Sequence, residues 1–416
     1  MSAGKLVQAN GRLYKRSERP IVVVCVDGSE PDYMEVAMKA GRMPWLKNLL
    51  SSKANTNLIA ESVVPSFTNP NNLSIVSGCP PRYHGICGNY FYNQETGEEE
   101  LMNAPSYYRA KTIFSSYQDA GAKVAVVTAK DKLRLLLGHG LDYSKGNAIC
   151  FSAEKSDLAN MEENGIENLN EFVGMPVPSV YSADLSEFVF AAGVKLMETV
   201  RPEIMYLSTT DFIQHKYAPE EEGALAFYEM MDGYWAQLDE MGAVLTLTAD
   251  HGMNPKHDSD GKPNVLYLQD LLDDWYGKEA ARVILPITDP YVVHHGALGS
   301  FATAYLPKGE SVDAAVERLS KVDGVELAIS GPAGCAMLEL PEDRMGDIII
   351  ISERHLALGT SEDRHDLSAL DRPLRTHGGI TEQKVPFISN RPMPGIPSDM
   401  RLRNFDAFYC SVNYAE

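Results

Sequence analysis

Carboxylates and imidazoles recur along this sequence at the ends of apolar segments. Asp250 and His251 lie side by side where the apolar run of residues 244–249 stops, just before Gly252. The candidates placed at segment ends are Asp27, Asp211, His215, Asp250, His251 and His377. Three carboxylates and three imidazoles make two sets of ligands suited to zinc or a similar divalent ion. A lone aspartate at a strand end is most often a turn residue, but its repetition at three strand ends favours a metal site.

A hydroxyl that could act as a nucleophile lies at the predicted start of a helix. Thr68 begins a helical run in the stretch TNPNNLSIV, with Pro70 in the first turn. A helix start favours a bound phosphoryl group, and a divalent ion beside the hydroxyl would lower its pKa. The alternative is that Thr68 or Asn69 only caps the helix, and the motif taken alone favours that alternative. Beside the ligand set, Thr68 becomes a candidate nucleophile.

The elements that must position these residues alternate between strand and helix. Apolar runs predict strands at residues 21–26, 58–64, 124–128, 204–207 and 244–248. Helical patterns lie at residues 43–52, after Pro70, before Gly121, and at residues 184–200 and 220–241. This alternation predicts an α/β fold with a mainly parallel sheet between helices. In such a sheet ligands bind at the carboxyl ends of the strands, which is where the aspartates lie.

The pattern of predicted helices and strands changes between His251 and His377. Residues 301–330 follow a strand–helix–strand pattern, and the stretch GDIIIISE adds a further strand. We therefore predict a metal-binding catalytic core of residues 1–280 and 370–416, and a smaller α+β cap insertion of residues 281–369. Active-site insertions commonly lie over the site as lids. Within the insertion, His294 and His295 are expected at a turn after a strand.

Composition limits the partners and the compartment. The chain has 416 residues and a formal net charge of −20, which argues against a nucleic-acid or acidic-membrane partner. Residues 1–19 show no secretory pattern, and no apolar run approaches membrane-spanning length. The six cysteines show no CxxC spacing, and Cys25 is expected to be a buried reduced thiol. These features predict a cytoplasmic protein, for which a homodimer stays open as the assembly state.

The ligand set and the nucleophile together carry a resemblance to a known family. The ordered positions closely resemble the alkaline phosphatase superfamily, and within it the nucleotide pyrophosphatase/phosphodiesterase-like branch. The stretch PRYHGICGNYFYN, which leads to Asn89, strengthens the resemblance. The resemblance implies an alkaline phosphatase-like core with two zinc ions. One ion would be held by Asp211, His215 and His377, and the other by Asp27, Asp250 and His251, with Thr68 bound to the second ion as a further ligand and as the nucleophile.

Two lysines point to the substrate. Lys130 and Lys132 follow a predicted strand in the stretch KVAVVTAKDKLRLLLG. They could be solvated side chains at a helix start, but positive charge there opposes the helix dipole, and an anionic substrate group would account for it. The segment resembles that of the phosphonoacetate hydrolase family, in which paired lysines hold the substrate carboxylate. This resemblance implies hydrolysis of a carbon–phosphorus bond through a phosphothreonine, giving acetate and phosphate from phosphonoacetate.

The small anionic phosphonate is expected to contact a defined group of side chains. By the resemblance, these are Thr68, Asn89, Lys130, Lys132, His215 and His377, with Asn89 donating a hydrogen bond to a phosphonyl oxygen. The alternative is a phosphodiesterase or nucleotide pyrophosphatase that uses the same metals and Thr68, with Tyr90 or Phe91 in an aromatic slot for a base. A binding protein without turnover is a further alternative. The lysine pair discriminates against the diesterase, because a diester has no carboxylate to hold.

Overall fold

The computed structural model describes residues 6–289, 296–368 and 370–416, and its core is a seven-stranded sheet. The strand order is β4-β19-β10-β3-β9-β7-β8. The strands are β3 (Ile21–Cys25), β4 (Thr56–Glu61), β7 (Val124–Thr128), β8 (Ala148–Ser152), β9 (Ile204–Ser208), β10 (Val244–Thr248) and β19 (Lys384–Ser389). Strand β19 pairs antiparallel with both β4 and β10, and the other strand pairs of this sheet in the described chain are parallel. The predicted mainly parallel sheet is confirmed.

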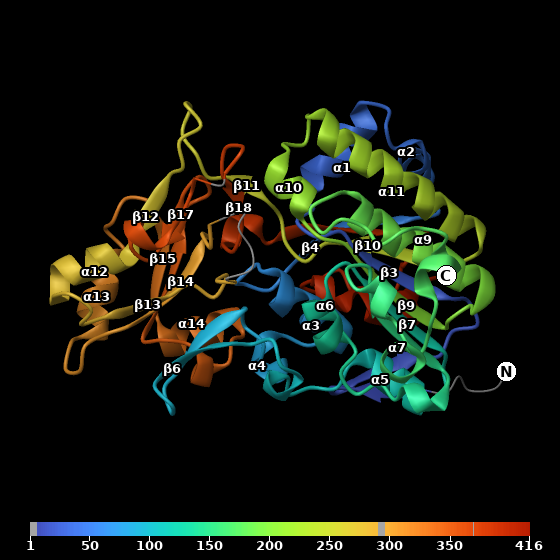
Figure 1. Ribbon diagram of the computed structural model, residues 1–416, viewed down its shortest axis with the longest axis horizontal. Helices are drawn as coiled ribbons and strands as arrows, with labels where there is room; N and C mark the ends of the chain where they lie inside the picture. The colour runs from blue at the N-terminus through green and yellow to red at the C-terminus, as the bar shows by residue number, and fades with distance from the viewer. Residues whose placement is uncertain (1–5, 290–295, 369) are drawn as a thin grey trace.

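Helices cover both faces of this sheet (Figure 1). Alternate side chains of β3 enter opposite layers, with Val22 and Val24 in one and Val23 and Cys25 in the other. One face is covered by α1 (Pro31–Lys39), α2 (Pro44–Ser51), α9 (Asp184–Thr199) and α11 (Glu222–Glu240). The other is covered by α3 (Thr68–Ser77), α5 (Ile113–Asp119), α6 (Asp131–Leu137) and α15 (Ala407–Tyr414). Burial of the strands on both faces explains their continuous apolar sequences.

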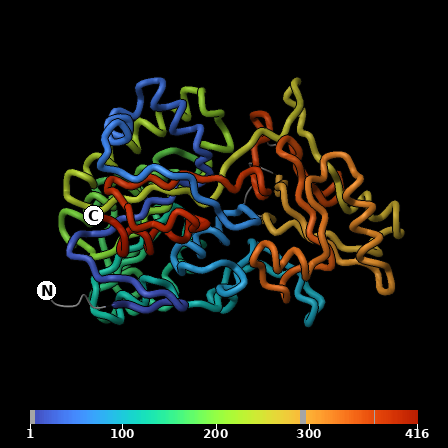
Figure 2. The backbone as a smooth tube through the Cα atoms, turned by 180° about the vertical axis from the view of Figure 1, so that it is seen from behind, coloured from blue at the N-terminus to red at the C-terminus, as the bar shows by residue number. Residues whose placement is uncertain are grey.

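A second, smaller unit lies beside the core in Figures 1 and 2. It is built on an antiparallel sheet of β13 (Arg282–Ile284), β14 (Phe301–Tyr305), β16 (Ile348–Ser352) and β15 (Val325–Ser330), with helices α13 (Val312–Leu319) and α14 (Gly331–Leu338). We call this unit the cap. The chain runs between core and cap through β11 (Asn254–Pro255) and β18 (Arg375–Thr376), which pair with each other.

The cap also takes up residues that precede its predicted start. Helix α12 (Leu268–Tyr276) contacts β13, and β12 (Val265–Tyr267) pairs with β17 (Ala357–Gly359). The division of the chain at residues 281 and 369 therefore stays a prediction. His294 and His295 lie outside the described residues, as do residues 1–5 and Ala369. Apart from short 3-10 helices, the remaining described helices and strands are β1 (Leu6–Ala9), β2 (Arg12–Lys15), α4 (Pro81–His84), β5 (Tyr90–Asn93), β6 (Glu98–Leu101), α7 (Met161–Asn164), α8 (Leu169–Val173) and α10 (Phe212–Lys216).

Local differences from the predicted elements have local causes. The strand expected at residues 58–64 ends at Glu61, because the Val63 amide donates to the Asn71 side chain at 2.8 Å and leaves the sheet. Helix α14 was not predicted, since Gly331 and Pro332 at its start are typical of turns. Cys25 is buried and free of disulfide bonding, as are the other five cysteines.

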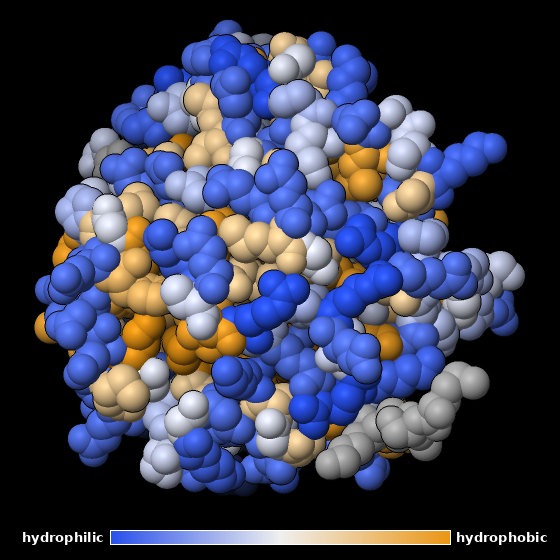
Figure 3. Space-filling view, turned by 90° about the vertical axis from the view of Figure 1, so that its right-hand side faces the viewer, coloured by the Kyte–Doolittle hydropathy of each residue, from blue (hydrophilic) through white to orange (hydrophobic). Residues whose placement is uncertain are grey.

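The surface contrasts with this core. On the face shown in Figure 3, hydrophilic side chains predominate, and apolar side chains gather mainly in one area. Among the described residues, every helix is too short or too polar to cross a membrane. The largest fully buried side chains include Trp235, Phe114 and Phe188, which lie inside the helix–sheet layers.

Candidate active site

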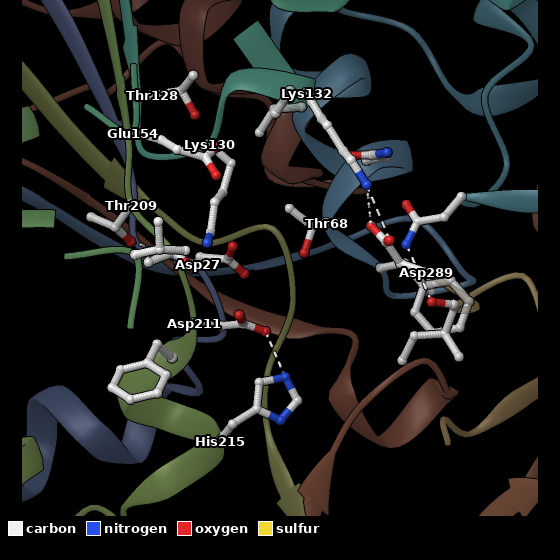
Figure 4. A pocket seen from close by; sticks show the side chains of 18 of the residues that line it. Asp27, Thr68, Thr128, Lys130, Lys132, Glu154, Thr209, Asp211, His215 and Asp289 are labelled. Carbon is white, nitrogen blue, oxygen red and sulfur yellow. Dashed lines mark hydrogen bonds and ion pairs between the residues drawn. The ribbon is translucent and has the colours of Figure 1, made fainter. Parts of the chain in front are cut away.

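The predicted residues converge on one cavity of about 240 Å³. Its walls include Asp27, Thr68, Asn89, Lys130, Lys132, Asp211, His215 and His377. Figure 4 shows Thr68 near the middle, with Asp27, Asp211 and Lys130 on one side of it and Lys132 and Asp289 on the other. Asp250 and His251 are fully buried and adjoin this group, because His251 Nε2 lies 3.4 Å from Thr68 Oγ1. The structure therefore brings together all ten residues that the sequence singled out.

The register of the sheet explains why the aspartates meet. Cys25 at the end of β3 pairs with Ser208 of β9 and with Thr248 of β10, so the chain leaves three neighbouring strands at one level. Asp27, Asp211 and Asp250 follow those positions closely. Short helix α10 begins after Asp211 and brings His215 back over it, as expected for the i, i+4 spacing.

The carboxylates and imidazoles form two adjoining groups. His215 Nε2 lies 2.8 Å from Asp211 Oδ2, and His377 Nε2 lies 3.5 Å from the same oxygen. His251 Nε2 lies 3.2 Å from Asp27 Oδ1 and 3.8 Å from Asp250 Oδ2. The His251 and His377 rings stack with centroids 3.6 Å apart, so the two groups share a border.

Each of the three imidazoles is oriented in the same way. The Nδ1 atoms face backbone carbonyl oxygens: His215 faces Arg375 O at 2.7 Å, His251 faces Gly252 O at 2.8 Å and His377 faces Ser66 O at 2.7 Å. Nδ1–H donation to a carbonyl fixes the tautomer that presents an unprotonated Nε2 to the centre. Burial, followed by the neighbouring His251, lowers the pKa of His377, which favours the neutral ring that binds a metal.

The electrostatics of the carboxylates also call for a cation. Burial, and next the charges of Asp211 and Asp250, raise the pKa of Asp27 well above its usual value. Among the described residues, Asp27 Oδ1 is buried and accepts no hydrogen bond. Although burial opposes it, contact with His215 and His377 holds the pKa of Asp211 well below its usual value. The donor set thus fits divalent cations, which would pair with the buried carboxylates.

The ligand groupings can be compared with the expected partition. Asp27, Asp250 and His251 offer ligand atoms within 4.8 Å of one another, in agreement with one predicted set. Asp211 and His377 form such a group with His251. The assignment of His215 to that ion stays a prediction, supported by its 2.8 Å contact with Asp211.

Thr68 lies at the start of helix α3 but does not cap it. It is the first residue of α3, and Phe67, which has no polar side chain, holds the N-cap position. The alternative that Thr68 or Asn69 merely caps the helix is therefore wrong. The Thr68 side chain is half-buried and its hydroxyl faces His251, while Asn72 Nδ2 donates to Thr68 O at 3.0 Å.

The two lysines occupy different surroundings in the same cavity. Lys130 is the N-cap residue of α6, and its Nζ lies 5.4 Å from the centre of the Tyr181 ring. Burial lowers the pKa of Lys130. Lys132 is the second residue of the helix, and its Nζ lies 3.1 and 3.2 Å from the two carboxylate oxygens of Asp289. Both ammonium groups reach the cavity, as the sequence predicted.

Asn89 lines the cavity, but the aromatic residues next to it do not form a slot. Asn89 Nδ2 donates to Ile287 O at 3.3 Å. Neither Tyr90 nor Phe91 is among the described residues that line the cavity. Phe91 packs edge-on against Tyr107 at 5.7 Å, and Tyr90 OH donates to Glu99. The prediction that Tyr90 or Phe91 forms an aromatic slot for a base is therefore wrong, because the β5–β6 hairpin directs both rings away from the cavity.

Three contributing residues were missed by sequence reasoning. Asn72 Nδ2 donates to Asp250 Oδ2 at 3.0 Å, and its position four residues after Thr68 on one helix could have revealed it. Thr209 Oγ1 accepts from the Asp27 amide at 2.9 Å. Asp289 precedes a proline in the stretch ITDPY, a typical turn pattern that gave no functional signal.

A match to a protein-family model shows which family this chain belongs to. The model described as type I phosphodiesterase / nucleotide pyrophosphatase matches residues 21–379, which include every predicted site residue. The chain belongs to this family. The fold and the predicted place in the alkaline phosphatase superfamily are thereby confirmed.

Solved structures show which members of the family this chain is similar to over its full length. The crystal structure of phosphonoacetate hydrolase from Sinorhizobium meliloti 1021 in complex with phosphonoformate is 59% identical, covers 100% of both chains and has a TM-score of 0.96. The same enzyme in complex with phosphonoacetate gives 58% identity over the same coverage, with the same TM-score of 0.96. The predicted resemblance to phosphonoacetate hydrolases is confirmed.

Matches to curated proteins are shorter. Phosphonoacetate hydrolase of Penicillium oxalicum is 52% identical over 42 residues, which are 9% of this chain and 58% of that protein. An uncharacterized pyrophosphatase/phosphodiesterase of Schizosaccharomyces pombe is 22% identical over 261 residues, which are 58% of this chain and 46% of that protein. The chain therefore matches less than two thirds of the length of either.

Proposed function

We propose that this protein hydrolyses the carbon–phosphorus bond of phosphonoacetate to acetate and phosphate, through a phosphothreonine on Thr68. The observation that carries the proposal is the meeting of Thr68, the carboxylate–imidazole groups and two lysines in one cavity of about 240 Å³. Breaking this bond expels a carbanion, which becomes tolerable only if an adjacent carboxylate takes the charge and cations meet it. The structure of the 59% identical phosphonoacetate hydrolase supports the substrate.

In the proposed reaction each residue has one task. Thr68 Oγ1 loses its proton to solvent and forms a bond to phosphorus as the phosphorus–carbon bond breaks. The electron pair passes to the acetate carbon and into its carboxylate as an enediolate, which Lys130 and Lys132 stabilise. Asn89 donates a hydrogen bond to a phosphonyl oxygen, and His215 and His377 border the phosphonyl group. A solvent proton completes acetate, and water then cleaves the phosphothreonine to release phosphate and restore the hydroxyl.

The proposal includes two zinc ions per chain. Asp211, His215 and His377 would hold one, and Asp27, Asp250 and His251 the other. When bound, such ions lower the pKa of a nearby hydroxyl and offset charge on phosphorus. We also propose the cytoplasm as the compartment, on the basis of six buried free thiols.

The substrate preference is the first expected outcome. With a zinc-loaded protein, kcat/KM for phosphonoacetate should exceed that for bis(nitrophenyl) phosphate, because the diester has no carboxylate for the two lysines. Phosphate release and nitrophenol release would be measured side by side at equal enzyme concentration. A higher kcat/KM for the diester would instead favour the phosphodiesterase alternative.

Metal removal should also change stability. A strong chelator is expected to remove two equivalents of zinc and to lower the melting temperature, because the buried carboxylates would lose their counter-charges. A ligand held at about 1,000 times its Kd adds about 4 kcal/mol to the free energy of unfolding. Elemental analysis and calorimetry provide the two measurements, and Asp313→Asn, an exposed cap variant, serves as the control. Less than one bound equivalent, or an unchanged melting temperature, would contradict the two-ion site.

A further inference from the structure

The ammonium group of Lys132 is held by a carboxylate from outside the core. Asp289 follows β13 of the cap, and its two oxygens lie 3.1 and 3.2 Å from Lys132 Nζ. The Asp289 side chain is 13% exposed, against 41% for Lys132. A cation at a helix start is opposed by the helix dipole, and a lysine stem is flexible. The negative charge of Asp289 offsets the unfavourable helix dipole, and its two contacts with Nζ restrict the flexible lysine stem.

The position of Asp289 is itself fixed by contacts with the core. The Asn89 amide donates to Pro286 O at 2.7 Å, and Asn89 Nδ2 donates to Ile287 O. Gly88 allows this approach, since a Cβ on Gly88 would lie 2.5 Å from Pro286 Cβ. Ile287 and Asp289 both line the cavity. One cap segment, residues 286–289, therefore touches Asn89 at the phosphonyl end of the proposed substrate site and Lys132 at the carboxylate end. Figure 4 shows the contact between Asp289 and Lys132.

We propose that Asp289 is a positioning residue that sets the Lys132 ammonium for the substrate carboxylate and so determines the preference for carboxylated phosphonates. This inference rests on the proposed function. An ammonium group has three N–H donors, so Lys132 can hold Asp289 and a substrate carboxylate together. Lys130 lies in the same cavity beside Glu154, so the two ammonium groups would face the carboxylates of Asp289 and Glu154 as well as that of the substrate. Without Asp289, Lys132 would lose this ion pair, and binding of the substrate would have to restrict its side chain further, which weakens binding.

The test compares Asp289→Ala and Asp289→Asn with the wild type. Acetate release would give KM and kcat for phosphonoacetate, and inhibition by inorganic phosphate would report on the phosphonyl end alone. Losing a charge-assisted contact should raise KM of Asp289→Ala about 10- to 100-fold, while the inhibition constant of phosphate stays within about threefold. Asp289→Asn should show a smaller rise, because its amide oxygen still accepts from Lys132. Asp313→Asn removes one exposed cap charge and serves as the matched control.

Several results would overturn the inference. An unchanged or lower KM would mean that Asp289 does not position Lys132, or that it competes with the substrate. A parallel rise in the phosphate inhibition constant would mean that Asp289 only docks the cap. If Asp289→Ala does not fold, as judged by circular dichroism, the KM of Asp289→Asn decides. A wild type that releases no acetate would refute the proposed function and this inference together, whereas an active wild type with unaffected variants would refute the inference alone.

Discussion

Replacing Thr68 by alanine is expected to reduce phosphate release from phosphonoacetate by roughly 1,000-fold or more, as for the loss of other covalent nucleophiles. The hydroxyl faces the ligand groups, with Thr68 Oγ1 3.4 Å from His251 Nε2. The fold should tolerate the change at a cost on the order of 1 kcal/mol or less, because Phe67 and not Thr68 is the N-cap of α3. Zinc content and circular dichroism would therefore match the wild type.

Two observations would distinguish covalent catalysis by Thr68 from direct attack of water on phosphorus. Thr68→Ser keeps a hydroxyl and should retain measurable turnover, which serves as the matched control. Acid-quenched wild type should carry one phosphoryl group on the peptide that contains Thr68, detected by mass spectrometry. Near-full activity of the alanine variant would mean that water is the attacking group.

The loss of Lys130 should depend strongly on the substrate. Lys130→Ala is expected to lower kcat/KM for phosphonoacetate about 10- to 100-fold through lost binding to the carboxylate, and further as charge grows in the transition state. A nitrophenyl phosphate ester should be affected far less, because its leaving group carries its own charge. Lys130→Arg should not restore full activity, since a planar guanidinium does not replace a compact ammonium. Kinetics on both substrates would measure the ratio.

The pH dependence gives this prediction a second readout. Burial lowers the pKa of Lys130, so its charged form is present at low pH and is lost at a lower pH than for an ordinary lysine. Activity toward phosphonoacetate should accordingly decline as the pH rises through that lowered pKa, and Lys130→Ala should lack this decline. If the variant loses both activities in equal proportion, Lys130 serves the phosphoryl group or the fold instead.

The parts of the site that the sequence predicted depend on local rules. Asp27 and Asp250 follow buried parallel strands, and the ends of such strands meet at one edge of a sheet. His215 follows Asp211 by one helical turn, so its position is also determined locally. These residues could be assigned because strand ends and helix spacing leave few alternative placements.

The site residues that the sequence did not predict, or placed wrongly, depend on contacts between residues far apart in the sequence. Asp289 and Lys132 are separated by 157 residues, and they meet only because the cap segment docks on Gly88 and Asn89. No periodicity in the stretch ITDPY encodes that docking. Tyr90 and Phe91 were placed wrongly in the diesterase alternative because nearness to Asn89 in sequence does not fix the direction of side chains in a hairpin.

Cleavage of the carbon–phosphorus bond can be observed by incubating the zinc-loaded wild type with phosphonoacetate in deuterated water. Phosphorus and proton nuclear magnetic resonance would follow the substrate and both products in one sample. We predict phosphate and acetate in equal amounts, with one deuterium on the acetate methyl group, because the broken carbon–phosphorus bond leaves a carbanion that solvent protonates. Phosphonoacetate that stays intact while a nitrophenyl diester is hydrolysed by the same sample would contradict the proposed function.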